Sequence, residues 1–224
     1  MPPAPRRSAT SAGSTAVSWD QVELAPLVLI TGSERLLAER AVDRLVAQAR
    51  AQDPAVEVSR VEAPAYQPGQ LEVVAGPSLF GEPRLVILED LQSGTDQAFA
   101  DVAAYVADPA PDVVLLVVHG GGVRGKKTLD LMLAAGARRV SCDPIKRDGD
   151  KTAFAVAELQ RAGRKAQPAA LRALVEACGT DLRELAAACQ QLASDTTGTI
   201  SVDVVARYYG GRVEATGFRV ADAA

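Results

Sequence analysis

The sequence predicts an α/β domain built on a parallel sheet, followed by a small helical domain. Three observations predict this fold class. Short apolar runs alternate with segments of helical period through the first two thirds of the chain. Several of these runs are apolar at every position, which is typical of parallel strands buried on both faces. After Pro144 the strand pattern disappears and only helical segments follow. The length of 224 residues fits two modest domains.

The first predicted domain alternates strands and helices. Its strands are runs that are fully apolar or alternate in polarity, and its helices carry apolar side chains three or four positions apart. Ser33 is the expected N-cap of the first helix. In chain order we expect strand 27–30, helix 34–50, strand 56–61, helix 67–74, strand 84–90, helix 95–108, strand 113–118, helix 126–135 and strand 139–142.

The second predicted domain contains only helices, at 150–163, 168–178, 180–194 and 202–209. Gly163 and Gly179 are typical helix stops, and Ser201 is the expected cap of the last helix. The resulting boundaries are a disordered tail over 1–22, the α/β domain over 23–143, the helical domain over 144–211, and the start of a missing further domain over 212–224.

Composition excludes several classes of function. There are 24 Lys and Arg against 28 Asp and Glu, whereas a domain that binds nucleic acid mainly through charge is usually basic. No apolar run approaches the roughly 18–20 residues of a membrane span. The chain has three scattered cysteines and one histidine, His119. We therefore expect buried, reduced thiols in a cytoplasmic protein, with no metal site and no disulfide framework.

An α/β domain followed by a helical bundle resembles the outline of an AAA+ ATPase module. Such a module needs a glycine-rich, lysine-containing loop between its first strand and first helix, where backbone N–H groups wrap the phosphates. Here residues 31–34 read Thr-Gly-Ser-Glu, with one glycine, no lysine and a carboxylate where phosphate would sit. We therefore expect an AAA+-like sheet without a functional phosphate loop, and no cofactor.

A second glycine-rich stretch, Gly120–Lys127, follows a strand and precedes a helix. It differs by one position from a phosphate-binding loop, because Lys127 occupies the place of the hydroxyl residue. One interpretation is therefore a P-loop-like NTPase that uses Lys126 and Thr128. The other is a flexible, solvated basic loop. Similarly, the acids Glu89 and Asp90 after an apolar strand are expected to cap the next turn rather than to act in catalysis.

Three stretches resemble one family when they are taken in order. They are residues 27–37, residues 78–88, and residues 178–185 continued by 200–211. On these stretches the chain resembles the delta subunit of the bacterial DNA polymerase III clamp loader, in an actinobacterial-looking form that ends before the C-terminal collar domain.

The resemblance implies a non-ATPase subunit that binds the sliding clamp and helps open it for loading onto primed DNA. It implies that the chain is no enzyme by itself but part of the DNA polymerase III holoenzyme, a nucleotidyltransferase complex. Its partners would be the clamp, the ATPase subunits of the loader, the delta-prime subunit and, through the complex, primed DNA. It would act in the cytoplasm at the nucleoid-associated replisome, with no membrane partner.

The resemblance places clamp binding at Ser78, Leu79 and Phe80, with the two apolar side chains as the gripping pair. From the residues alone, Leu79 and Phe80 are equally compatible with pinning their loop onto the core. A secondary expectation is DNA contact by Arg124, Lys126 and Lys127 once the loader is assembled.

Overall fold

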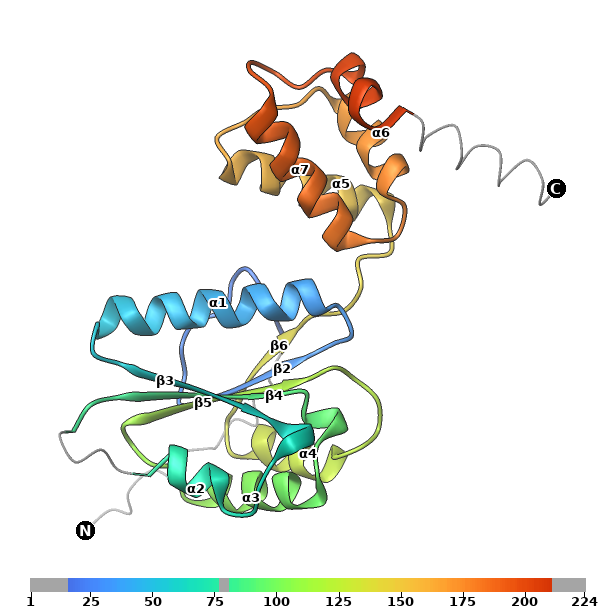
Figure 1. The fold of residues 1–224 in the computed structure, drawn as a ribbon. Coiled ribbons are helices and arrows are strands. Elements are labelled where there is room, and N and C mark those ends of the chain that lie inside the picture. The colour runs from blue at the N-terminus through green and yellow to red at the C-terminus, as the bar shows by residue number, and fades with distance from the viewer. Residues whose placement is uncertain (1–15, 77–80, 211–224) are drawn as a thin grey trace, which may run out of the picture. The chain divides into compact units, whose positions relative to one another are not determined.

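The computed structural model describes residues 16–76 and 81–210, and the chain divides into two units between Pro144 and Ile145. In the described residues, the sheet lies in the first unit, and the second is built of helices (Figure 1). Among the described helices, none is both long enough and apolar enough to cross a membrane.

The sheet of the first unit is parallel throughout its described strands, as the sequence predicts. Its order is β1-β6-β2-β5-β4-β3. The strands are β1 (Val17–Ser18), β2 (Leu27–Thr31), β3 (Glu57–Glu62), β4 (Arg84–Glu89), β5 (Val113–His119) and β6 (Arg138–Ser141).

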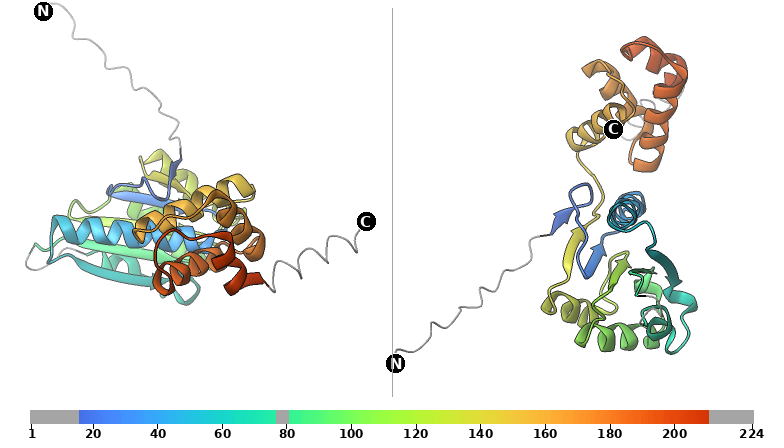
Figure 2. Two further views of the ribbon diagram at one scale, coloured as in Figure 1. Left: turned by 90° about the horizontal axis from the view of Figure 1, so that it is seen from above. Right: turned by 90° about the vertical axis from the view of Figure 1, so that its left-hand side faces the viewer.

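Helices cover both faces of the sheet. Helix α1 (Arg35–Gln52) lies on one face, and α2 (Gln70–Val74), α3 (Asp96–Ala107) and α4 (Lys126–Ala134) lie on the other (Figures 1 and 2). Because side chains alternate along a strand, Leu27 and Leu29 of β2 pack into the core beneath α2, α3 and α4. Val28 and Ile30 are equally buried and point toward the α1 face.

The connections change sides of the sheet between β2 and β5. The chain leaves β2 through α1 on one face and leaves β5 through α4 on the other, although these two strands are neighbours. In open α/β sheets, the crevice outside the carboxyl ends of the strands at such a switch point is the usual place for a ligand. The ends of β2, β4 and β5 are therefore where a functional site is expected.

The ordered structure begins earlier than the sequence predicts. Strand β1 pairs with β6 at the edge of the sheet, and the side chain of Val22 is fully buried. Its carbonyl accepts hydrogen bonds from Arg44 Nε at 3.0 Å and Gln48 Nε2 at 2.9 Å. These contacts join residues 16–22 to β6 and α1, which are distant in sequence, so no local sequence pattern predicts them. The prediction of a disordered tail is wrong for this segment.

The second unit packs α5 (Asp148–Arg161), α6 (Pro168–Cys178), α7 (Leu182–Asp195) and a helical segment over 202–210. As the sequence predicts, the Ser201 hydroxyl lies at the start of the last segment, 3.4 Å from the backbone N–H of Val204. Asp181 caps α7 by accepting the N–H of Glu184 at 2.9 Å.

Arg164 holds the end of α7 in place. Its guanidinium donates to the carbonyls of Ala193 and Thr196, to the Thr196 hydroxyl at 3.0 Å and to the Gly198 carbonyl at 3.0 Å. These acceptors include carbonyls that the helix itself leaves unpaired at its C-terminus. One side chain therefore closes the end of α7 and the turn after it.

Arg164→Ala is expected to lower the free energy of unfolding of the helical unit by about 2 kcal/mol, because hydrogen bonds to a charged group are lost together. Urea unfolding followed by circular dichroism measures the change. Arg172→Ala, at an exposed position of α6, is the control. A loss at Arg164 no larger than the loss at Arg172 would contradict the capping role.

Candidate functional site

The junction between β2 and α1 is closed by its own hydrogen bonds. The Gly32 N–H donates to the His119 carbonyl at 3.2 Å, and the Glu34 N–H donates to the Cys142 carbonyl at 3.0 Å. The Cys142 N–H in turn donates to the Thr31 carbonyl at 2.7 Å. Because a phosphate loop works by presenting free backbone N–H groups, this junction lacks donors that such a loop requires.

Glu34 supplies the negative charge at the start of α1. Its Oε1 accepts the N–H of Leu36 at 3.3 Å, so the N-cap is Glu34 and the prediction of Ser33 is wrong. The helix begins one residue later than expected, which brings the longer carboxylate side chain to the free N–H groups. A helix N-terminus attracts anions, and here the carboxylate already lies where a phosphate would bind. The residues at this junction therefore do not fit the phosphates of a nucleoside triphosphate.

The backbone around Gly32 is packed too tightly to accept a side chain. Its φ is +137°, and a Cβ there would lie 2.2 Å from the carbonyl carbon and oxygen of Cys142. Burial, with the nearby charges of Asp143 and Glu34, raises the pKa of the Cys142 thiol to about 12. All three cysteines are buried. The junction is therefore a packed structural joint, and Cys142 is a protonated core thiol.

The acids at the end of β4 belong to a hydrogen-bonded network. Asp90, at φ 53°, accepts a hydrogen bond from Gln92 Nε2 at 2.9 Å, and Gln92 Oε1 accepts the N–H of Gly120 at 2.7 Å. Arg60 pairs with Glu89. Asp90 stands at the N-cap position of a short 3-10 turn, but its side chain makes no cap hydrogen bond. The described part of the chain holds no group of three or more His, Cys, Asp or Glu placed to bind a metal ion.

The glycine-rich loop over 120–125 is braced, in contrast to the flexible loop that the sequence suggests. His119 Nδ1 accepts the N–H of Gly121 at 3.2 Å, so Nε2 carries the proton and donates to the Arg124 carbonyl at 3.0 Å. The Arg124 guanidinium pairs with Asp96 at 3.2 Å and lies 5.5 Å from the centroid of the Phe99 ring. The single histidine thus ties both ends of the loop together.

The geometry of α4 disfavours the P-loop-like interpretation. Thr128 is buried, and its hydroxyl donates to the Phe99 carbonyl at 3.3 Å. That hydroxyl is therefore not presented to a metal ion in the loop. Lys126 and Lys127 are exposed at the start of the helix beside Arg124. The structure brings the three predicted DNA-contact residues together, and their contact with DNA stays a prediction.

The predicted clamp-binding residues Ser78, Leu79 and Phe80 lie outside the described residues. On the side preceding them, the carbonyl of Gly76 accepts a hydrogen bond from Arg84, which also pairs with Glu57 at 3.0 Å. Helix α2 ends just before, and its Val73 side chain is 76% exposed. The segment that precedes the predicted clamp contact is therefore tied to the start of β4.

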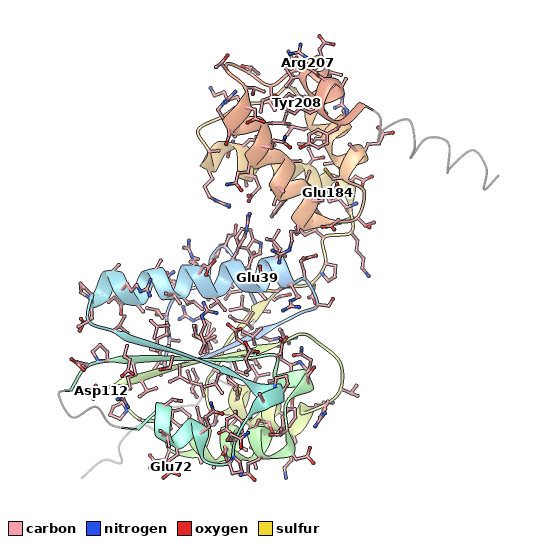
Figure 3. All side chains as sticks on the ribbon, viewed as in Figure 1. Glu39, Glu72, Asp112, Glu184, Arg207 and Tyr208 are labelled. Atoms are coloured by element: carbon pink, nitrogen blue, oxygen red, sulfur yellow. The ribbon has the colours of Figure 1, made fainter. Side chains whose placement is uncertain are left out.

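Helix α2 itself is held by the buried Tyr66 and the partly buried Asp101. The Tyr66 hydroxyl accepts the N–H of Leu71 at 2.8 Å and donates to Asp101 Oδ2 at 2.9 Å, and the same oxygen accepts the N–H of Gly69 at 2.9 Å. Burial raises the pKa of Tyr66 to about 12. Burial opposes ionisation of Asp101, but hydrogen bonds from Gly69, Gln97 and Tyr66 outweigh it and lower its pKa. Figure 3 shows α2 with Glu72 on its outer side.

Comparisons with known proteins identify the fold. No family model and no curated protein sequence matches the chain. Among solved structures, the DNA clamp loader delta protein of Bacillus subtilis (YqeN) matches with a TM-score of 0.58 and 19% identity, over 84% of this chain and 59% of that one. Two variants of RuvB from Thermotoga maritima match at 10% and 12% identity, each over 83% of this chain and 61% of theirs, with TM-scores of 0.52 and 0.51.

The chain thus spans less than two thirds of the length of these proteins. At these identities the likeness shows the fold alone. That fold is a parallel sheet flanked by helices, with a helical unit after it. It is AAA+-like, which confirms the fold class that the sequence predicts.

Proposed function

We propose that the protein is a non-ATPase subunit of a replicative clamp loader, which binds the sliding clamp and helps open it for loading onto primed DNA. The observation that carries this proposal is the likeness in fold to a clamp loader delta protein over 84% of the chain. The closed β2–α1 junction agrees with a subunit that binds no nucleotide. In this proposal the chain acts through protein contacts and performs no chemistry of its own.

Clamp recognition is assigned to Leu79 and Phe80, with Ser78 beside them. An apolar pair between Pro77 and Gly81 is suited to enter an apolar pocket of a partner, and such anchors dominate the energy of interfaces. The contacts that hold α2 and Gly76 support this role, because an anchor binds more tightly when little conformational freedom is lost on binding. The Tyr66 hydroxyl bridges the N–H of Leu71 in α2 and the Asp101 carboxylate in α3, and Arg84 of β4 donates to the carbonyl of Gly76.

The same proposal assigns the partners and the place of action. The chain would join the ATPase subunits and the delta-prime subunit in the DNA polymerase III holoenzyme, in the cytoplasm at the replisome. The exposed Lys126 and Lys127, with Arg124 beside them, would meet phosphates of primed DNA within the complex.

The direct test is complex formation in solution. The purified chain is mixed with a bacterial sliding clamp at micromolar concentrations without nucleotide and examined by size-exclusion chromatography with light scattering. We expect a species whose mass equals the clamp plus bound chain. Separate elution at all ratios would overturn the proposed function.

A further inference from the structure

Strand β3 forms one edge of the sheet and pairs with β4 alone among the described strands (Figure 2). In a parallel pair, every second residue of a strand directs its backbone N–H and C=O groups to the same neighbour. The Glu57 N–H donates to the Pro83 carbonyl at 3.0 Å, just before β4, which fixes the alternation. The residues whose backbone groups point away from the sheet are therefore Val58, Arg60 and Glu62.

The backbone of this edge is regular. Strand β3 keeps its register with β4 over all six of its residues, so it contains no bulge, and it contains no proline. Bulges and prolines are two devices by which natural edge strands avoid pairing with another strand. The outward N–H and C=O groups of β3 are therefore arranged to bond a further strand, and its charged side chains decide which strand fits.

Two opposite charges stand on one side of this edge. Val61 packs into the core beneath α2, α3 and α4. Because side chains alternate along a strand, Arg60 and Glu62 both lie on the α1 face. The Arg60 side chain pairs with Glu89 and is still 50% exposed, and Glu62 is exposed. Both side chains are thus within reach of a strand added beside β3.

Glu62 lies in an excess of negative charge. It is paired with Glu89 in the register of β3 and β4, and like charges at such positions are unfavourable. Desolvation, followed by the charges of Glu89 and Asp90, raises the pKa of Glu62, although the charge of Arg35 acts in the opposite direction. A cation supplied from outside the chain would stabilise the charged carboxylate.

A second copy of β3, running antiparallel, supplies that cation. Two identical strands related by a two-fold axis form a contact in which every pairing occurs twice. With the axis at Val61, Arg60 of each strand lies opposite Glu62 of the other, on the same face of the sheet. Moving the axis by one residue in either direction sets two arginines or two glutamates opposite each other, which is destabilising. The charges therefore select a single register.

We propose that two copies of the chain associate through their β3 edges, antiparallel, to form one continuous sheet. Arg60 and Glu62 of each copy exchange backbone hydrogen bonds with Glu62 and Arg60 of the other, and their side chains form two ion pairs. A guanidinium has five N–H donors, so Arg60 keeps its contact with Glu89 while it binds the second carboxylate. The contact uses no residue assigned to clamp binding, so it is tested independently of the proposed function.

Sedimentation equilibrium of the full chain alone, from about 10 μM to about 1 mM, measures the association. We expect a monomer–dimer equilibrium with a dissociation constant on the order of 100 μM, because so small a contact gives weak binding. A chain that stays monomeric over the whole range would overturn the proposal.

Charge reversal tests the register. Arg60→Glu and Glu62→Arg should each weaken self-association by at least about tenfold, because two attractive pairs become repulsive. An equimolar mixture of the two variants should associate again, since one chain then carries two acids where the other carries two bases. This rescue excludes misfolding as the cause of the loss. Glu72→Arg, the same charge change on the outer side of α2, is the control and should associate like the original chain.

Hydrogen exchange followed by NMR at low and high protein concentration reports on the backbone bonds. The amides of Arg60 and Glu62 should become protected only at high concentration. The Val58 amide should stay unprotected, because β3 of the other copy gives way to a 3-10 turn at Ala63, before the position opposite Val58. Variants that associate like the original chain, a mixture that fails to associate, or protection of Val58 equal to that of Arg60 would each overturn the assignment.

Discussion

Replacing Leu79 and Phe80 together with alanine is expected to weaken binding to a bacterial sliding clamp by about 3–6 kcal/mol. Fully burying each of these side chains contributes about 1.5–3 kcal/mol. The dissociation constant should therefore rise by more than about a hundredfold. Because the pair is proposed to face the partner, the free energy of unfolding should change by less than about 0.5 kcal/mol. Biolayer interferometry and urea unfolding measure the two quantities.

Leu131→Ala is the matched control for this experiment. Leu131 is a large apolar residue on α4 that is 42% exposed, and its replacement should leave clamp binding unchanged. A double alanine variant that unfolds more easily but binds normally per folded molecule would show that Leu79 and Phe80 pin their loop onto the core. That outcome would remove the basis for the proposed clamp contact.

Gly32→Ala is expected to lower the free energy of unfolding by about 4 kcal/mol. The new Cβ would lie 2.2 Å from the backbone of Cys142, and the φ of +137° is rarely adopted by residues other than glycine. Backbone strain costs about 1–3 kcal/mol, and overpacking a tight joint costs a similar amount. Urea unfolding followed by circular dichroism gives the value.

Gly136→Ala separates the two contributions. Gly136 also has a positive φ, of +89°, but a Cβ there would meet nothing within 4 Å. It should cost only the backbone strain, roughly 1 kcal/mol. If Gly32→Ala is no more destabilising than Gly136→Ala, the β2–α1 junction yields easily, as a nucleotide-binding loop would, and its description as a closed joint is wrong.

Much of the fold can be predicted from the sequence because the strands are buried on both faces. Runs such as 27–30 and 113–118 are apolar at every position, and they correspond to β2 and β5 with few changes at their ends. Strand β1 could not be predicted, because a strand of two residues is too short to show an alternation of polarity. It is defined by its pairing with β6. Glu34 replaces Ser33 as the N-cap because its N–H is held by the Cys142 carbonyl, which is distant in sequence, while its carboxylate accepts the N–H of Leu36.

The lack of a lysine and the presence of Glu34 at the β2–α1 junction can be taken directly from the residue types there. The cleft at the carboxyl ends of β2, β4 and β5 could not be predicted, because it arises where the sheet order brings Arg60 of β3, Asp90 after β4 and one side of α1 together. The bracing of the loop around His119 likewise depends on Phe99 and Asp96, which are distant in sequence.

Isothermal titration calorimetry with the full chain tests most directly whether the protein binds a sliding clamp without nucleotide. The sliding clamp is titrated with and without ATP and Mg²⁺, and ATP with Mg²⁺ is titrated alone. We expect clamp binding with the same dissociation constant in both conditions, and no saturable heat from nucleotide. Micromolar binding of ATP that is lost in Lys126→Ala, or clamp binding that appears only with nucleotide, would contradict the proposed function.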